Sequence, residues 1–299
     1  MLTVIVVSSC NDDNNDGNGT SAVVNTNKNP APYEALQFPK VKGGKSDIIV
    51  HTTTDYGFTY GLEWDHTLKA QRWTCFFFTD KNRVKNWYRN QWKSTTWGGD
   101  PFQKDPSVPS AEQPEPYGEF SGSSYPDKGF SYFQRGHICP SEDRVCSQEA
   151  NEQTFYMTNM FPQGENFNTG IWENMESFVR NNWGRKTTGS DTLFVVKGGT
   201  IDRENDILCR TRSGFIVPRY FFMALLLKKN TSYQAMGFWV EHLSSDHSAD
   251  LLNNYVVNIR ELEQKTGIDF FCNLPDNIEE QVETQSVDII KRLWNLTNH

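Results

Sequence analysis

Two neighbouring stretches of sequence are the most informative about the fold of this chain. The first is Ser131–Arg144 (SYFQRGHICPSEDR), an aromatic segment with strand character that reaches Arg135–His137 and is broken at Pro140. The second is Phe155–Glu176 (FYMTNMFPQGENFNTGIWENME), in which a second strand-like run is followed by a helical pattern carrying an amide and a carboxylate. A strand, a broken loop, a second strand and a helix are therefore expected in direct succession.

The segments around these stretches predict an α+β domain with a mixed or antiparallel central sheet and flanking helices. Strong turn signals separate most of the expected strands, and three apolar stripes have helical spacing. The expected strands are 47–54, 72–78, 131–138, 154–160, 192–196, 214–217, 220–227 and 233–240, and the expected helices are 169–182, 259–265 and a stripe over 278–293.

The N-terminus differs from the rest of the chain in composition. Residues 1–10 end in a short apolar run, two serines and Cys10, an order that resembles a lipoprotein signal whose cysteine becomes lipidated. Residues 11–46 are rich in Asn, Gly, Lys and Pro and predict a disordered polar linker. Residues 47–299 form the expected domain, and no apolar stretch is long enough for a transmembrane helix. We therefore expect an outer-membrane or cell-surface lipoprotein, or a secreted protein.

The formal charge of −8 is concentrated in two short segments. Residues 1–20 contain three acidic residues and residues 276–290 contain five, with no basic residue in either segment, so the remainder is formally neutral. Clustered positive charge attracts a phosphate backbone more than the whole-chain sum indicates, although the same cluster fits a solvated loop. This basic cluster consists of Lys81, Arg83, Lys85, Arg89 and Lys93, interleaved with Trp87, Tyr88 and Trp92.

The polar residues of the two opening stretches match the needs of phosphodiester hydrolysis. His137 is the candidate base, because neutral imidazole accepts a proton near neutral pH, and Arg135 offers a fork for phosphate. Asn168 offers a neutral oxygen to Mg²⁺, which keeps several waters in its shell. Glu176 lies eight residues further along, too far on a helix to share the ion directly. A helix cap at Asn168 and a solvated helix face at Glu176 are the structural alternatives.

In these residues the chain resembles the DNA/RNA non-specific endonucleases, the ββα-metal or His-Me finger group that includes mitochondrial endonuclease G. Order and spacing follow the family pattern, and weaker likenesses extend from about Asp47 to Glu283. The resemblance implies a ββα-metal finger active site within the α+β domain. The residues that carry the likeness are Arg135, Gly136, His137, Pro140, Asn159–Gln163, Asn168, Trp172 and Glu176.

By this resemblance, the protein is expected to be a Mg²⁺-dependent endonuclease that cuts DNA and RNA without sugar specificity, with Mn²⁺ as an alternative ion. His137 would be the general base, Asn168 the metal ligand, and Glu176 the partner of a metal-bound water. Arg135 would complete the catalytic set and also bind phosphate.

The family resemblance also suggests substrate contacts outside this catalytic set. Asn159 is one candidate, and an arginine before the long loop is another, for which Arg89 is preferred to Arg83. The chain departs from the family at Gln134, where an aspartate usually stands. Because glutamine is neutral, we expect it to hold Arg135 less firmly than an aspartate would.

Two other functions remain compatible with the sequence. One is a surface lipoprotein that binds a polymer through its aromatic residues and has a decayed nuclease site, and Gln134 is the feature that favours it. The other is a related phosphodiesterase that acts on small substrates, because the width of the cleft depends on how the proline-rich loop over residues 101–130 packs.

Overall fold

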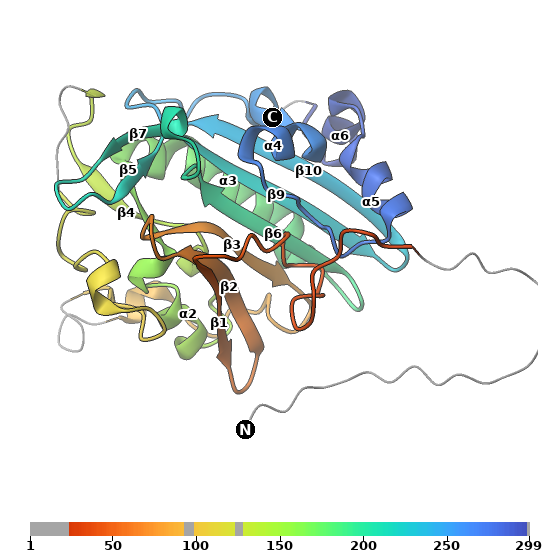
Figure 1. Cartoon of the computed structure of the whole chain (residues 1–299). Helices are drawn as coiled ribbons and strands as arrows, with labels where there is room; N and C mark the ends of the chain where they lie inside the picture. Colours follow the sequence, from red (N-terminus) through yellow and green to blue (C-terminus); the bar gives the residue numbers. More distant parts are fainter. Residues whose placement is uncertain (1–23, 93–98, 123–127, 298–299) are drawn as a thin grey trace, which may run out of the picture.

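The computed structural model describes residues 24–92, 99–122 and 128–297. Its centre is a seven-stranded antiparallel sheet with the strand order β1-β2-β3-β6-β9-β10-β11, and β4–β5 and β7–β8 form two separate ribbons (Figure 1). The expected α+β class is confirmed. The strands are β1 (Ser46–Thr53), β2 (Gly57–Asp65), β3 (Ala70–Phe78), β4 (Phe133–His137), β5 (Met160–Gly164), β6 (Thr192–Gly199), β7 (Ile207–Arg210), β8 (Ile216–Pro218), β9 (Tyr220–Lys229), β10 (Ser232–Glu241) and β11 (Val256–Val257).

The central strands are apolar on both faces. In β3, Phe76 and Phe78 belong to one hydrophobic cluster, whereas Trp73 and Cys75 belong to another. Successive side chains of a strand point to opposite faces, so the two clusters lie on opposite sides of the sheet. Both faces must consequently be covered, and the helices do so. These are α2 (Gln148–Gln153), α3 (Glu173–Phe178), α4 (Ile259–Thr266), α5 (Asp276–Glu283) and α6 (Val287–Leu293).

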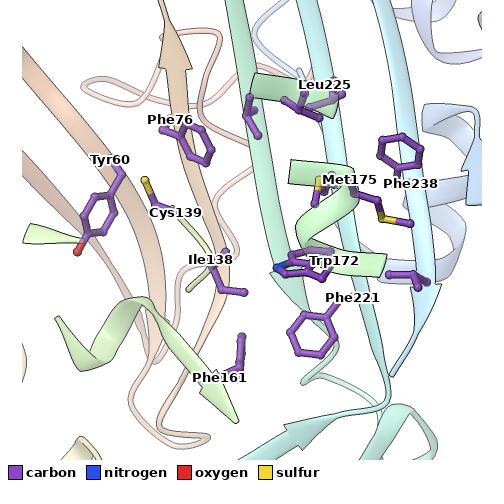
Figure 2. Close-up of a cluster of buried hydrophobic side chains, with 14 of the residues drawn as sticks. Tyr60, Phe76, Ile138, Cys139, Phe161, Trp172, Met175, Phe221, Leu225 and Phe238 are labelled. Carbon is purple, nitrogen blue, oxygen red and sulfur yellow. The ribbon is translucent and has the colours of Figure 1, made fainter. Parts of the chain in front are cut away.

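One face is covered mainly by the helical segment that contains α3. Single helical turns over Phe167–Trp172 and Val179–Trp183 flank α3 and correspond, with it, to the helix expected over 169–182. Figure 2 shows Trp172 and Met175 of this segment packed toward Phe221 and Leu225 of β9. Among the described residues, none of the helices is both long and apolar enough to cross a membrane.

The opposite face is covered by α4, α5 and an N-terminal strap, residues 24–45, which the sequence led us to assign to a disordered linker. That prediction is wrong for the strap. Phe38 is buried against Trp73, and the amide of Asn29, which is fully buried, hydrogen-bonds Pro39 and Val41. The Asn25 side chain donates to the carbonyl of Cys272 at 2.9 Å. Asparagine amides satisfy the backbone groups of a polar segment, which composition alone does not reveal.

A long excursion, residues 79–191, connects β3 to its neighbour β6 and contains the ribbon β4–β5. A strand was expected over 154–160, but Met157–Asn159 forms a helical turn and β5 begins at Met160. The reason is that side chains of this segment bind backbone groups: Thr154 Oγ1 donates to Asn151 O at 2.6 Å. Pro162, which lacks an N–H, is tolerated because β5, among the described strands, pairs with β4 alone.

Candidate active site

A cleft of about 860 Å³ opens between β4 and the helical segment Phe167–Trp183. It brings together five of the seven site residues proposed from the sequence. All five come from the excursion between β3 and β6, so one insertion supplies the predicted chemistry. These five are Arg89, Arg135, His137, Asn168 and Glu176.

His137 ends β4, opposite Met160 of β5. A Cβ at the preceding Gly136 would lie 2.2 Å from the side chain of Gln163, so any larger residue here would require that buried side chain to move. The imidazole ring lies near Phe155 and Phe102, with centroids 5.0 and 5.7 Å away. Its Nε2 is enclosed and has no hydrogen-bond partner among the residues that the structure describes, whereas the residue remains partly exposed, so we infer that Nδ1 faces the cleft.

The surroundings of His137 favour a neutral imidazole. Burial lowers its pKa well below the usual value, and the positive charges of Arg89, Lys197 and Arg135 lower it further. A base must be unprotonated before it can act. The same charges that attract phosphate therefore keep His137 ready to accept a proton at neutral and mildly acidic pH.

Asn159 was proposed from the sequence as a substrate contact, and the structure places it elsewhere. The residue is fully buried, and its Oδ1 accepts from the backbone of Cys139 at 2.8 Å. Its Nδ2 donates to the carbonyls of Cys139 and Thr154, at 2.9 and 2.8 Å. Since both ends of the amide are used, Asn159 fixes the loop behind His137 and does not reach a substrate.

Asn168 reaches the cleft from the helical turn Phe167–Trp172. Its Nδ2 donates to Oε1 of Gln134 at 2.6 Å, so the oxygen of the amide is left for another partner. This contact changes the interpretation of Gln134, which was expected to act on Arg135. Arg135 instead donates to the carbonyl of Pro116 at 2.8 Å. Gln134 therefore orients the candidate metal ligand and not the arginine.

Glu176 lines the same cleft as Asn168 and belongs to a buried network of alternating charges. It contacts Lys197 of β6 and, at 4.0 Å, Arg180, which in turn pairs with Asp143. Burial raises the pKa of Glu176, and the charges of Lys197 and Arg180 oppose that rise. Sequence reasoning missed Lys197, Arg180 and Asp143. The detectable signal was Lys197, a single charge within an otherwise apolar and glycine-containing strand.

The arginines of the basic cluster have different surroundings. Arg89 lines the cleft, pairs with Asp100 and lies over the Phe155 ring at 5.2 Å. Arg83 pairs with Asp80 at 2.8 Å and lies outside the cleft lining. Arg135 lies over the ring of Phe102, 3.7 Å from its centroid. Of the other cluster members, Lys93 lies outside the described residues.

A family model of DNA/RNA non-specific endonucleases matches residues 46–277. The chain belongs to this family. The match confirms the expected hydrolytic endonuclease and agrees with a metal-dependent site. It spans every residue that lines the cleft, so the geometry described above belongs to the family's domain.

Individual relatives are consistent with this assignment. The chain is 28% identical over 177 residues to Nuclease C1 of Cunninghamella echinulata var. echinulata, covering 58% of this chain and 67% of that protein. It is 27% identical to a nuclease of a Nostoc species, covering 74% and 79%, and 22% identical to mitochondrial endonuclease G of Homo sapiens, covering 72% and 73%. A crystal structure of an EndoG/EndoGI complex shares the fold, with a TM-score of 0.57, 17% identity and coverage of 77% and 88%.

The first prediction concerns the pH dependence of kcat/KM, whose acid limb reports the free enzyme's base. In Arg89→Ala, one of the positive charges that lower the pKa of His137 is gone, so protonation of the imidazole becomes easier. The acid limb should move to higher pH, whatever the loss in substrate affinity. Arg83→Ala is the matched control and should leave the limb unchanged. Movement of the limb to lower pH in Arg89→Ala would contradict this account.

The second prediction tests the contact between Gln134 and Asn168. Gln134→Leu removes the acceptor that orients the amide, so the divalent-metal concentration for half-maximal activity should rise by roughly 10- to 100-fold. Gln134→Glu keeps an acceptor oxygen and should not need more metal than the wild type. A metal titration of initial rates measures both, and an unchanged requirement in Gln134→Leu would rule out the orienting role.

Proposed function

We propose that this endonuclease uses Mg²⁺ and hydrolyses phosphodiester bonds in both DNA and RNA. The observation that carries the proposal is that Asn168, oriented by Gln134, shares one cleft with His137, Arg89 and Arg135. A base, a metal ligand and phosphate-binding cations are thus side by side. This arrangement argues against a polymer-binding protein with a decayed site, because a candidate base, an amide oxygen for a metal and phosphate-binding cations are all present.

The residues of the cleft fit a hard divalent cation with few protein ligands. Asn168 presents an amide oxygen, and its nitrogen is already engaged by Gln134. Mg²⁺ keeps several waters and completes its shell with phosphate oxygens, so one neutral ligand suffices, and Mn²⁺ is the alternative ion. When bound, the ion polarises the phosphoryl group and stabilises charge on its oxygens. Glu176 also lines this cleft, but its carboxylate is paired with Lys197, which suits an indirect role in metal binding.

His137 supplies the base for the attacking water. With Nε2 enclosed, Nδ1 is the nitrogen that can accept the proton from a water in the cleft. The aromatic rings of Phe102 and Phe155 restrict the orientation of the imidazole. A positioned base of this kind contributes roughly 10²- to 10⁴-fold to the rate.

Arg135 and Arg89 are proposed to hold the phosphate backbone. Arg135 lies on the Phe102 ring, which fixes the plane of its guanidinium group. Arg89 is paired with Asp100, and binding of a phosphate would compete for this pair. Both arginines are proposed to contact phosphate oxygens and not base edges, which would favour recognition of the backbone over recognition of sequence.

The third prediction tests the proposed function with plasmid DNA and RNA as substrates. Both should be cut in Mg²⁺, and excess EDTA should abolish cleavage without unfolding the protein. His137→Ala should lower the single-turnover rate by roughly 10²- to 10⁴-fold with little loss of binding. His66→Ala is the control, because His66 pairs with Asp47 and Glu112 outside the cleft. Full activity in EDTA would contradict the metal dependence, and cleavage of small phosphodiesters alone would favour the small-substrate alternative.

We also propose that the protein acts outside the cytoplasm, as an outer-membrane or cell-surface lipoprotein or in secreted form. The support is the apolar run, the two serines and Cys10 in residues 1–10, which lie outside the described residues. A nuclease exported in this way would meet nucleic acids that are not the cell's own.

The fourth prediction concerns this location. When the full-length chain is expressed in a cell that processes lipoproteins, it should partition into the detergent phase. Cys10→Ala removes the acceptor for lipid and should move the protein to the aqueous phase, whereas Cys209→Ala should not. Wild-type protein that stays in the aqueous phase would exclude the lipid anchor.

A further inference from the structure

A second pocket, separate from the cleft, lies where the strap meets α4 and α5. Its volume is about 290 Å³, and its lining shares no residue with the cleft. Arg260 is the one basic residue among those that line it, so the formal charge of the lining is −5. The acidic residues of the lining are Glu263, Asp269, Asp276, Glu279, Glu280 and Glu283.

Several of these carboxylates are buried, which distinguishes the pocket from an ordinary acidic surface. Glu283 is 1% exposed and Glu279 is 7% exposed. The side chain of Glu263 keeps 14% exposure. Buried charges in folded proteins are normally paired with opposite charges or coordinated to metals. Arg260 cannot neutralise the set, although it approaches Glu283 at 3.0 Å and Glu280 at 2.6 Å.

The geometry indicates where a cation could compensate the negative charge of these carboxylates. Glu283 uses Oε2 for Arg260, whereas its Oε1 is enclosed and has no hydrogen-bond partner within the described part of the chain. One oxygen each from Glu263, Asp269 and Glu283 lie within 4.8 Å of one another. Two oxygens on opposite sides of a Ca²⁺ ion are separated by up to roughly 5 Å, twice the Ca–O distance, so oxygens this close can share one ion.

We propose that this pocket binds one Ca²⁺ ion through Glu263, Asp269 and Glu283, and that the ion fastens the N-terminal strap to the C-terminal helices. The ligands are all carboxylate oxygens, which suit a hard cation, and the absence of histidine or cysteine from the lining disfavours zinc. Asn27 of the strap donates to Asp269 at 3.2 Å and to Glu279 at 2.9 Å. An ion bound to these carboxylates would therefore fix the position of the oxygens that accept hydrogen bonds from the strap.

The alternative to a cation is protons. Burial, followed by the repulsion of Glu263 and Glu279, raises the pKa of Glu283 to about 9. Burial likewise raises the pKa values of Glu263 and Glu279 to about 7. Either the carboxylates hold protons near neutral pH or a cation compensates their charge, and the two cases differ in their response to Ca²⁺.

The fifth prediction distinguishes a bound Ca²⁺ ion from bound protons by thermal unfolding of the full chain. The Asn168→Ala background removes the proposed catalytic ligand, so that ions bound in the cleft do not contribute. In this protein, Ca²⁺ at about 100-fold above its Kd should raise Tm by roughly 3–6 °C relative to EDTA. Calorimetric titration should give one Ca²⁺ per chain. The same concentration of Mg²⁺ should produce a smaller rise.

Adding Glu283→Gln, which keeps the shape of the side chain, should abolish both the rise in Tm and the calorimetric signal. Asp269→Asn provides a second test if Glu283→Gln does not fold. Glu204→Gln is the matched control, because Glu204 pairs with Arg210 away from the pocket, and it should retain the full rise. No Ca²⁺-dependent rise, an equal rise in Glu283→Gln, or an equal rise with Mg²⁺ would overturn the proposal.

Discussion

The burial of both faces of the central sheet is the constraint on which the other parts of this structure depend. A strand such as β3, with Phe76 on one side and Trp73 on the other, cannot leave either side in water. The helical segment around α3 must therefore lie against one face, held by Trp172 and Met175 (Figure 2). Because Asn168 and Glu176 belong to that same segment, the packing of the sheet also sets where the proposed metal ligand lies.

The network beneath the cleft follows from this packing at an energetic cost. Lys197 projects from a buried strand toward Glu176 and lies 4.6 Å from the centroid of the Trp172 ring. A buried ion pair stabilises a fold only weakly, because desolvation of the two charges offsets their attraction. Its presence at the cleft is better explained by electrostatics, since the charge of Lys197 is also among those that lower the pKa of His137.

The sequence predicted residues that the structure brings together in one cleft, but it did not predict the charged residues beneath them, for physical reasons. His137, Asn168 and Glu176 belong to one continuous motif with fixed spacing, so a linear pattern contains them. Lys197 belongs to a different strand, and only the pairing of β6 with β3 brings it beneath the cleft.

The two misassigned asparagine-containing segments reflect a further limit of sequence patterns. Asn159 belongs to the motif, yet its amide is consumed by backbone groups of Cys139 and Thr154. Asn29 lies in a segment with the composition of a linker and is nevertheless fully buried. An asparagine whose amide closes a loop and an asparagine whose amide binds a ligand are identical in the sequence. Only the positions of their hydrogen-bond partners in the structure distinguish the two roles.

The strap has a consequence for how the enzyme matures during synthesis. Its contact from Asn25 to Cys272 joins positions 247 residues apart, so the strap cannot dock until nearly the whole chain has left the ribosome. Contacts of such sequence separation form late, because loop-closure entropy must be offset first. The nascent chain consequently lacks its final packing while most of it is being made, which delays the appearance of a finished nuclease until synthesis is almost complete.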